Sequence, residues 1–202
     1  RALLEAAAGR TLSVMFPMVS EPWEFDEARA IFERQREWIA KQGRATPTRI
    51  RYGTMLEVPA LAETLDMILP KLDFLSIGTN DLTQFLFAAD RANPKLAERY
   101  DWLSPAILRF IRRVTRECQA ADVPVTICGE MGGRTLEAMA LIGIGIERLS
   151  ITPAAIAPVK AMVRSLNICD TKEIMKTLLA HPPADIRATL IEWAREKNVE
   201  IV

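Results

Sequence analysis

Acidic, amide and thiol side chains follow three of the apolar segments in this sequence of 202 residues. Glu57 comes directly after one segment, Asn80 and Asp81 follow the next, and Cys128 ends a third. The carboxyl ends of parallel strands meet at one edge of a sheet, so we expect the Glu57 and Asp81 carboxylates to face one point. Oxygen ligands without clustered His or Cys favour Mg²⁺ or Mn²⁺, which also bind the oxygens of a phosphate or carboxylate substrate.

The residues around the second carboxylate could bind an anion. The segment Gly78-Thr79-Asn80 opens a helix, where backbone N–H groups attract anions, and Arg91 follows that helix, where a guanidinium can hold two phosphate oxygens. Each residue also has a purely structural interpretation. Glu57 could be an acid near a helix start, Asp81 could cap a helix over 82–88, and Arg91 could pair with a neighbouring surface acid. Spacing leaves both interpretations open.

Cys128 directly precedes Gly129 at the expected strand end, where a thiol can reach a substrate and act as a general acid. The sequence has two other cysteines, Cys118 and Cys169, which we interpret as packing residues. An odd number of cysteines without metal-ligand spacing argues against a disulfide framework or a zinc site. The single histidine, His181, lies between two late helices and is not expected to be catalytic.

Apolar, β-branched runs alternate with amphipathic stretches, which predicts βα units around a parallel sheet. Five strands are expected, at Leu12–Phe16, Ile50–Glu57, Phe74–Gly78, Val123–Cys128 and Arg148–Ile151. The main helices are expected at 22–41, 104–121, 154–166, 171–180 and 183–197. This order fits an open doubly wound sheet or part of a (β/α)8 barrel. No repeat or flexible linker interrupts it, so we predict a single domain over residues 1–202.

Balanced charge excludes several function classes. The chain has 26 basic and 26 acidic side chains, so it lacks the electrostatic surface expected of a nucleic-acid or anionic-membrane partner. No apolar run reaches the roughly 18 to 20 residues of a membrane helix, and no signal pattern opens the chain, which predicts a cytoplasmic protein. Arg1 stands inside a helical pattern, so we expect a piece of a longer protein.

Six segments together closely resemble the phosphoenolpyruvate (PEP)-binding barrel of the PEP-protein phosphotransferases, enzyme I of the bacterial phosphotransferase system. They are VMFPMVS (Val14–Ser20), GTMLEVPA (Gly53–Ala60), DFLSIGTNDLTQFLFAADRAN (Asp73–Asn93), LSPAILRFI (Leu103–Ile111), CGEMGG (Cys128–Gly133) and LSITPAAIAPVK (Leu149–Lys160). The resemblance implies a parallel α/β (β/α)8 TIM barrel, of which this chain holds the last five strands and their helices. The first barrel strands and an N-terminal phosphohistidine domain would be absent.

The resemblance also implies roles for the strand-end residues. Glu57 and Asp81 would bind Mg²⁺, Asn80, Asp81 and Arg91 would bind PEP, and Cys128 would donate a proton to the enolpyruvate carbon. In the family, the phosphoryl group moves to a histidine of the same protein, pyruvate is released, and a phosphocarrier protein is supplied. Family members form homodimers. Two further substrate arginines of the family precede Arg1, so catalysis by this chain alone is not expected.

Three alternatives are weighed against this interpretation. Pyruvate phosphate dikinase and PEP synthase use related barrels, but the Asp90-Arg91-Ala92-Asn93 segment favours enzyme I. Metal-dependent pyruvate aldolases also place a Glu and an Asp at strand ends, but they do not require Cys128-Gly129-Glu130. The chain could also be an assembly module without activity of its own. Arg134 stands where sugar-pathway members would carry an Asp, which favours the nitrogen-regulatory branch over the sugar branch.

Overall fold

One parallel sheet organises the chain, whose computed structural model describes residues 1–97 and 100–201. Its four strands are β1 (Thr11–Phe16), β2 (Arg49–Leu56), β3 (Phe74–Gly78) and β4 (Val125–Cys128). Each strand pairs in parallel with the next strand in the chain, giving the order β1-β2-β3-β4. The order of a doubly wound sheet reverses at its switch point, whereas the strands of a (β/α)8 barrel follow one another. The chain therefore has a parallel α/β fold of the barrel type.

The fifth predicted strand, Arg148–Ile151, is reduced to an isolated bridge between Leu149 and Ile127. Ile127 N donates to Arg148 O at 3.0 Å, and Ser150 N donates to Ile127 O at 2.8 Å. The segment cannot extend far, because α8 begins at Pro153, a residue without an N–H that favours the first turn of a helix. The prediction of a full strand here is therefore wrong, although the segment takes the fifth place in the sheet.

The helices lie close to their predicted positions. They are α1 (Ala2–Ala6), α2 (Pro22–Lys41), α3 (Leu65–Ile68), α4 (Thr79–Phe87), α5 (Pro94–Ala97), α6 (Pro105–Ala120), α7 (Thr135–Gly143), α8 (Pro153–Ser165), α9 (Ile168–Ala180) and α10 (Ile186–Glu196). Short 3-10 turns are η1 (Pro59–Thr64), η2 (Leu69–Lys71) and η3 (Met131–Gly133). The prediction over 22–41 is confirmed at both ends, since α2 begins at Pro22 and ends at Lys41. Glu21 and Glu24 form a capping box at its start.

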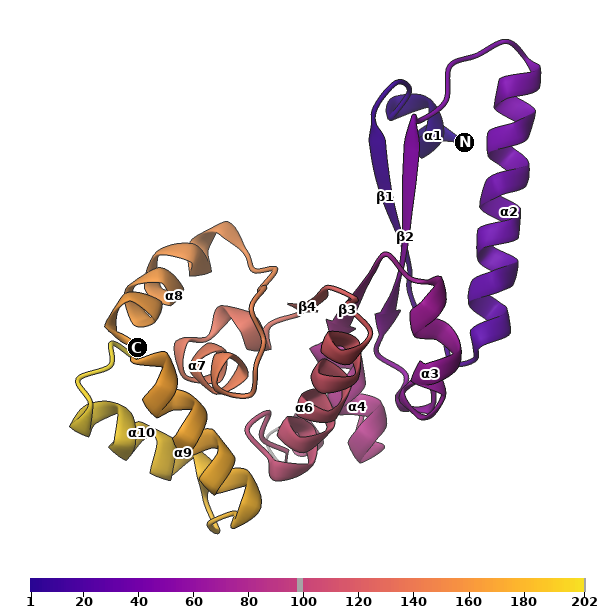
Figure 1. Cartoon of the computed structure of the whole chain (residues 1–202). Coiled ribbons are helices and arrows are strands. Elements are labelled where there is room, and N and C mark those ends of the chain that lie inside the picture. Colours follow the sequence, from indigo (N-terminus) through magenta and orange to yellow (C-terminus); the bar gives the residue numbers. More distant parts are fainter. Residues whose placement is uncertain (98–99, 202) are drawn as a thin grey trace.

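Helix α2 lies along β1 and β2 at one end of the molecule (Figure 1). Phe25 is fully buried, with its ring centroid 5.6 Å from that of Phe16 on β1. Tyr52 on β2 donates its hydroxyl to Glu33 of α2 at 2.6 Å. These contacts fix the position of β2 and hence of the residue that follows it.

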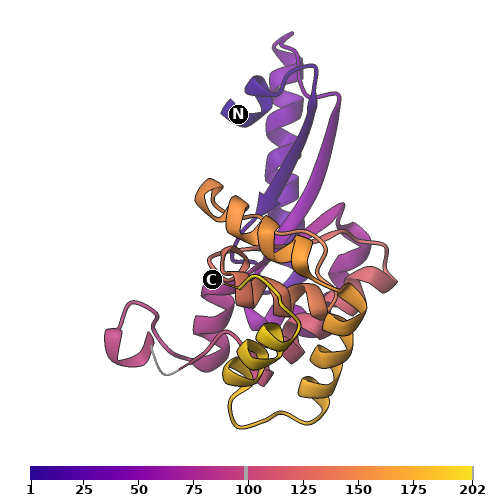
Figure 2. The ribbon, with the colours of Figure 1, turned by 90° about the vertical axis from the view of Figure 1, so that its left-hand side faces the viewer.

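The C-terminal helices α7 to α10 gather at the opposite end, with β3, β4, α4 and α6 in between (Figures 1 and 2). One continuous cluster of buried apolar residues extends from Val14 to Val199. Within β3, Leu75 and Ile77 are fully buried on one face, and the intervening Ser76 points to the other face. In the described part of the chain, no helix has both the length and the apolar character needed to cross a membrane.

Candidate active site at the carboxyl ends of the strands

Three neighbouring strands bring the predicted residues to one edge of the sheet. Glu57 directly follows β2, Asn80 and Asp81 lie in the first turn of α4 directly after β3, and Cys128 is the last residue of β4. The register pairs Gly78 at the end of β3 with Cys128. Adjacent parallel strands therefore place all four residues where barrel enzymes carry their active sites.

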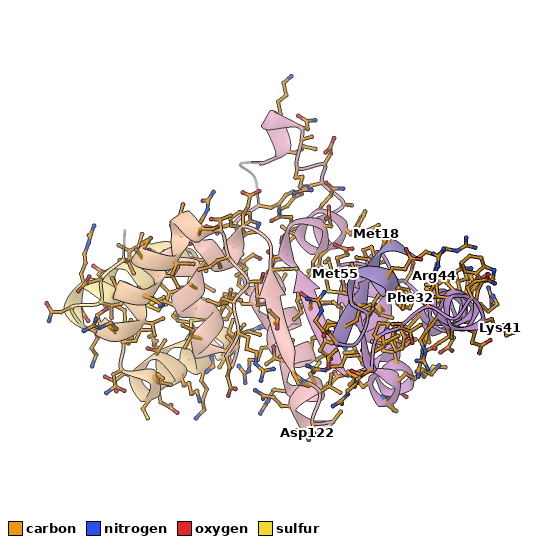
Figure 3. The ribbon with its side chains drawn as sticks, turned by 90° about the horizontal axis from the view of Figure 1, so that it is seen from above. Met18, Phe32, Lys41, Arg44, Met55 and Asp122 are labelled. Carbon is orange, nitrogen blue, oxygen red and sulfur yellow. The ribbon has the colours of Figure 1, made fainter. Side chains whose placement is uncertain are left out.

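Glu57 is a buried carboxylate with only 4% of its surface exposed. Its Oε1 accepts the backbone N–H of Met18 at 2.8 Å, which ties the turn after β1 to the end of β2. A Cβ atom on Gly78 would lie 2.8 Å from Glu57 Oε2 and 3.0 Å from Met55 Sδ, so this close approach needs a glycine. Figure 3 labels Met18 and Met55, which lie near each other in that view.

Asp81 is more open than Glu57, with about a third of its side chain exposed, and its Oδ1 lies 3.4 Å from Arg91 Nη2. The pairing of Arg91 with a neighbouring acid is therefore confirmed. The capping interpretation is wrong for Asp81, because α4 begins at Thr79 with Gly78 as its N-cap and without a side-chain cap. Glu57 is not a cap either, since Val58 precedes η1 and no side-chain bond caps that turn. Asp81 does lie in the first turn of α4, where a carboxylate interacts favourably with the helix dipole, so that part of the structural interpretation is confirmed.

Asn80 is fixed by the end of β4. Its Oδ1 accepts the Glu130 N–H at 3.1 Å, and its Nδ2 donates to Glu130 Oε1 at 3.4 Å. Thr79 adds a hydroxyl bond to Cys128 O at 3.0 Å. Gly129 has φ +100°, and a Cβ there would come within 2.5 Å of Thr79 Oγ1, so the close contact between α4 and β4 requires glycine.

The thiol of Cys128 lies among hydrogen-bonding groups of β3. Its sulfur accepts the Ser76 hydroxyl at 3.2 Å and is 3.5 Å from Ile77 O, to which the S–H donates. Burial raises the pKa of the Cys128 thiol, the charges of Glu57 and Asp81 raise it further, and the Ser76 bond opposes them. The thiol is therefore protonated at neutral pH, as a general acid must be.

The two carboxylates suit a hard divalent cation. Within residues 1–97 and 100–201, no Lys, Arg or His forms an ion pair with Glu57, and a buried carboxylate without a counter-charge is costly. Glu57 lies against Gly78, which pairs with Cys128, and Asp81 lies in the first turn of the helix that follows Gly78. The described residues contain no group of three or more His, Cys, Asp or Glu side chains placed to hold a metal. Mg²⁺ often uses one or two protein carboxylates and takes its other ligands from substrate and water.

A cavity of about 590 Å³ opens at Asn80, between α4 and the C-terminal helices, and Glu57, Asp81 and Cys128 are not among the residues that line it. Its charged lining includes Arg91, Glu130, Arg134 and Arg187. The Arg134 guanidinium lies 4.7 Å from the ring centroid of Trp102, which also lines the cavity. A cavity of this size with converging polar groups is typical of a small-molecule site.

Sequence reasoning missed Met18 and Ser76, and it considered Thr79 only as a backbone donor to an anion, whereas all three hold the predicted residues in place. Ser76 had a detectable signal, since it is a hydroxyl residue in an otherwise apolar strand, two positions before Gly78 and thus on the same face. Met18 had none, because it contributes a backbone N–H that any residue could supply.

The fold and the strand-end residues define a barrel-type domain that carries two carboxylates and a thiol at the carboxyl edge of its sheet. Comparison with known proteins gives the family: residues 1–168 match the family described as PEP-utilising enzyme, PEP-binding domain, and the chain belongs to it. The resemblance inferred from the sequence motifs is confirmed.

Curated relatives carry the name PEP-protein phosphotransferase. The protein from Cupriavidus necator is 36% identical over 96% of this chain and 33% of its own length, and the one from Staphylococcus carnosus is 34% identical over 95% and 34%. A Salmonella typhimurium protein named phosphoenolpyruvate-dependent phosphotransferase system is 39% identical over 98% of this chain and 27% of its own length. The chain thus spans about a third of the length of these relatives.

Proposed function

We propose that this chain is the PEP-binding part of a PEP-protein phosphotransferase. In this proposal, PEP transfers its phosphoryl group to a histidine on a part of the protein outside this chain, and pyruvate is released. The observation that carries it is the placement of Glu57, Asp81 and Cys128 at the carboxyl ends of three adjacent strands in a chain of this family.

Glu57 and Asp81 would hold Mg²⁺, or Mn²⁺ in its place. When bound, the metal supplies positive charge that neutralises the phosphate and the developing enolate. Asp81 would exchange its present partner, since the Arg91 side chain is 52% exposed and can move to a phosphoryl oxygen. Asn80 lines the cavity and forms two hydrogen bonds with Glu130, which suits a residue that positions the substrate.

Cys128 would act after the phosphoryl group has left. The remaining pyruvate enolate needs a proton on its methylene carbon, and the Cys128 S–H supplies it. Burial and the two carboxylates raise the pKa of this thiol, which keeps the proton on the sulfur until the enolate forms.

At the level of the whole protein, we propose a cytoplasmic homodimer of the nitrogen-regulatory branch that supplies a phosphocarrier protein. The names of the relatives support a phosphotransferase system. Arg134, which lines the cavity, is the residue that separates the two branches in this proposal.

Calorimetric titration of PEP into the chain, with and without Mg²⁺, tests the central part of the proposal. We expect heat that depends on Mg²⁺ in the wild type and is lost in Glu57→Gln and Asp81→Asn. Glu63→Gln is the matched control, because it removes the same charge from a side chain that is 71% exposed. Binding heat in Glu57→Gln equal to that of the wild type would contradict the proposal. So would the absence of binding heat in a wild-type chain that circular dichroism shows to be folded, and this result would favour the assembly module. Cleavage of a hydroxy acid by the chain would favour the aldolase.

A further inference from the structure

Ser76 is a buried hydroxyl residue in the middle of β3, with 6% of its surface exposed. Its hydroxyl donates to Cys128 Sγ at 3.2 Å, across the β3–β4 pair. All buried side-chain nitrogen and oxygen atoms of the described residues have a hydrogen-bond partner, so this bond is part of a fully satisfied arrangement. A buried hydroxyl that donates its hydrogen bond to a sulfur atom, a weak acceptor, calls for an explanation.

The strand register explains how the two side chains meet. Ser76 lies directly opposite Thr126, and Gly78 lies opposite Cys128. Side chains two positions apart on a strand share a face, so Ser76 is the diagonal neighbour of Cys128. Gly78 carries no side chain, which leaves the space over the end of β3 for the side chains of Glu57 and Met55. The bond between Ser76 and Cys128 therefore depends on the register of the adjacent strands β3 and β4.

The thiol has its donor and acceptor directions defined. The thiol donates to Ile77 O at 3.5 Å, and the Ser76 hydroxyl donates to the sulfur at 3.2 Å. The charged groups acting on the sulfur are Glu57, from the end of β2, and Asp81, from the first turn of α4, and both oppose a negative charge there. The Ser76 hydroxyl is an uncharged donor to the sulfur, and its hydrogen bond favours the negative charge that Glu57 and Asp81 oppose.

We propose that Ser76 is a positioning residue for Cys128, which orients the thiol and stabilises the sulfur when it becomes a thiolate. This inference rests on the proposed function, in which Cys128 is the proton donor. The S–H bond breaks, its proton bonds to the enolate carbon to form the methyl group of pyruvate, and the electron pair stays on sulfur. The Ser76 O–H bond remains intact and its hydrogen bond becomes charge-assisted, which strengthens it. Solvent then returns the proton to sulfur.

The test compares Ser76→Thr with Ser76→Val in the chain without substrate. The two variants have the same shape and differ by one hydroxyl, so crowding and access affect them equally. The rate of alkylation of Cys128 by iodoacetamide is measured against pH by mass spectrometry, because only the thiolate reacts. Thr126→Val is the matched control, since it removes a hydroxyl from the position opposite Ser76. The exposed Cys169 serves as internal reference.

A hydrogen bond to a charged group contributes enough to move a pKa by about one unit. We therefore expect Ser76→Val to react about tenfold more slowly than Ser76→Thr below the midpoint of its pH profile, with the midpoint raised by about one pH unit. Thr126→Val and the reaction of Cys169 should be unchanged. Equal rates for the Thr and Val variants, or an equal shift in Thr126→Val, would overturn the role of Ser76.

The readout separates this inference from the proposed function, because alkylation needs neither PEP nor metal. A hydroxyl-dependent thiol in a chain that fails to bind PEP would contradict the proposed function alone. Metal-dependent PEP binding combined with equal Thr and Val rates would contradict Ser76 alone.

Discussion

Two buried glutamates at different places in the fold have opposite surroundings. Glu137, in the first turn of α7, is 2% exposed, and its Oε1 lies 2.5 Å from Arg187 Nη2 of α10. Arg187 also holds Asp101 through two hydrogen bonds of 2.6 and 2.7 Å. Glu57 is 4% exposed and accepts a backbone N–H from Met18, with no ion pair in the described part of the chain.

We interpret Glu137 as a structural carboxylate and propose that Glu57 is a functional one. A guanidinium inside the protein replaces the water that a buried carboxylate loses. The ion pair between Glu137 and Arg187 also holds α7 and α10 together. A buried charge that meets only a dipole remains attractive to an external cation. We therefore propose that Glu57 is available to bind a cation, whereas Glu137 already has its counter-charge in Arg187.

Breaking the complete network should have the largest effect on stability. Arg187→Ala leaves Glu137 buried without its cation and removes both bonds to Asp101, so we expect the free energy of unfolding to fall by about 3 kcal/mol. Urea denaturation measures it. The control Lys176→Ala breaks an ion pair whose side chains are about 70% exposed, and should change stability by less than about 0.5 kcal/mol. Equal effects of the two substitutions would contradict the importance of the network.

Crowding the open site should have the next largest effect. Gly78→Ala places a methyl group 2.8 Å from Glu57 Oε2, so the carboxylate or the backbone must move, at a cost of about 2 kcal/mol. Gly132→Ala is the control, because its nearest neighbour would be at 3.4 Å, an ordinary contact. Thermal or urea unfolding distinguishes them, and a Gly78→Ala protein as stable as the control would show that Glu57 has freedom to shift.

Neutralising each glutamate in turn tests the comparison itself. Glu137→Gln weakens an ion pair, so we expect the free energy of unfolding to fall by about 1 to 2 kcal/mol. Glu57→Gln removes a buried charge that has no counter-charge in the described residues, so stability should stay the same or rise by up to about 1 kcal/mol. Parallel urea titrations give both values, and a loss of similar size in the two variants would remove the distinction.

The smallest expected effect is on the acid side of the pH profile. Burial favours the neutral form of Asp101, but hydrogen bonds from Arg187 and the Leu103 N–H, together with positive charge, lower the pKa of its carboxyl below the usual value. A lowered folded-state pKa contributes stability above the unfolded pKa of about 3.9 and loses it as pH falls through the folded value.

Stability should therefore decline below about pH 4, and Asp101→Asn should show a smaller decline over that range. The Asp101 and Arg187 side chains are partly exposed to solvent, so we expect a difference below about 1 kcal/mol. Identical acid profiles for wild type and Asp101→Asn would place the acid sensitivity elsewhere in the chain.

The features that could be predicted from the sequence are those that depend on residues adjacent in the chain. Pro22 and the acids beside it define the start of α2, and polar residues directly after apolar strands define the active-site edge. Parallel pairing then brings Glu57, Asp81 and Cys128 together without any further information.

The remaining features depend on contacts between distant segments. Arg187 and Glu137 meet across 50 residues, and the partner of Ser76 follows from the register of β3 and β4 rather than from its neighbours in the chain. The fifth strand was predicted from apolar character alone, whereas its length is limited by Pro153 at the start of α8. Pairing of this kind is decided by packing, which a single sequence does not encode locally.

Binding of Mn²⁺ alone, measured by electron paramagnetic resonance of the free ion, tests most directly whether the Glu57 carboxylate is a cation ligand. The wild-type chain and Glu63→Gln should bind Mn²⁺ equally, because Glu63 is a surface residue. Glu57→Gln should weaken binding by more than about tenfold while remaining folded. If a folded Glu57→Gln protein binds Mn²⁺ as tightly as the wild type, the assignment of Glu57 as a metal ligand is contradicted.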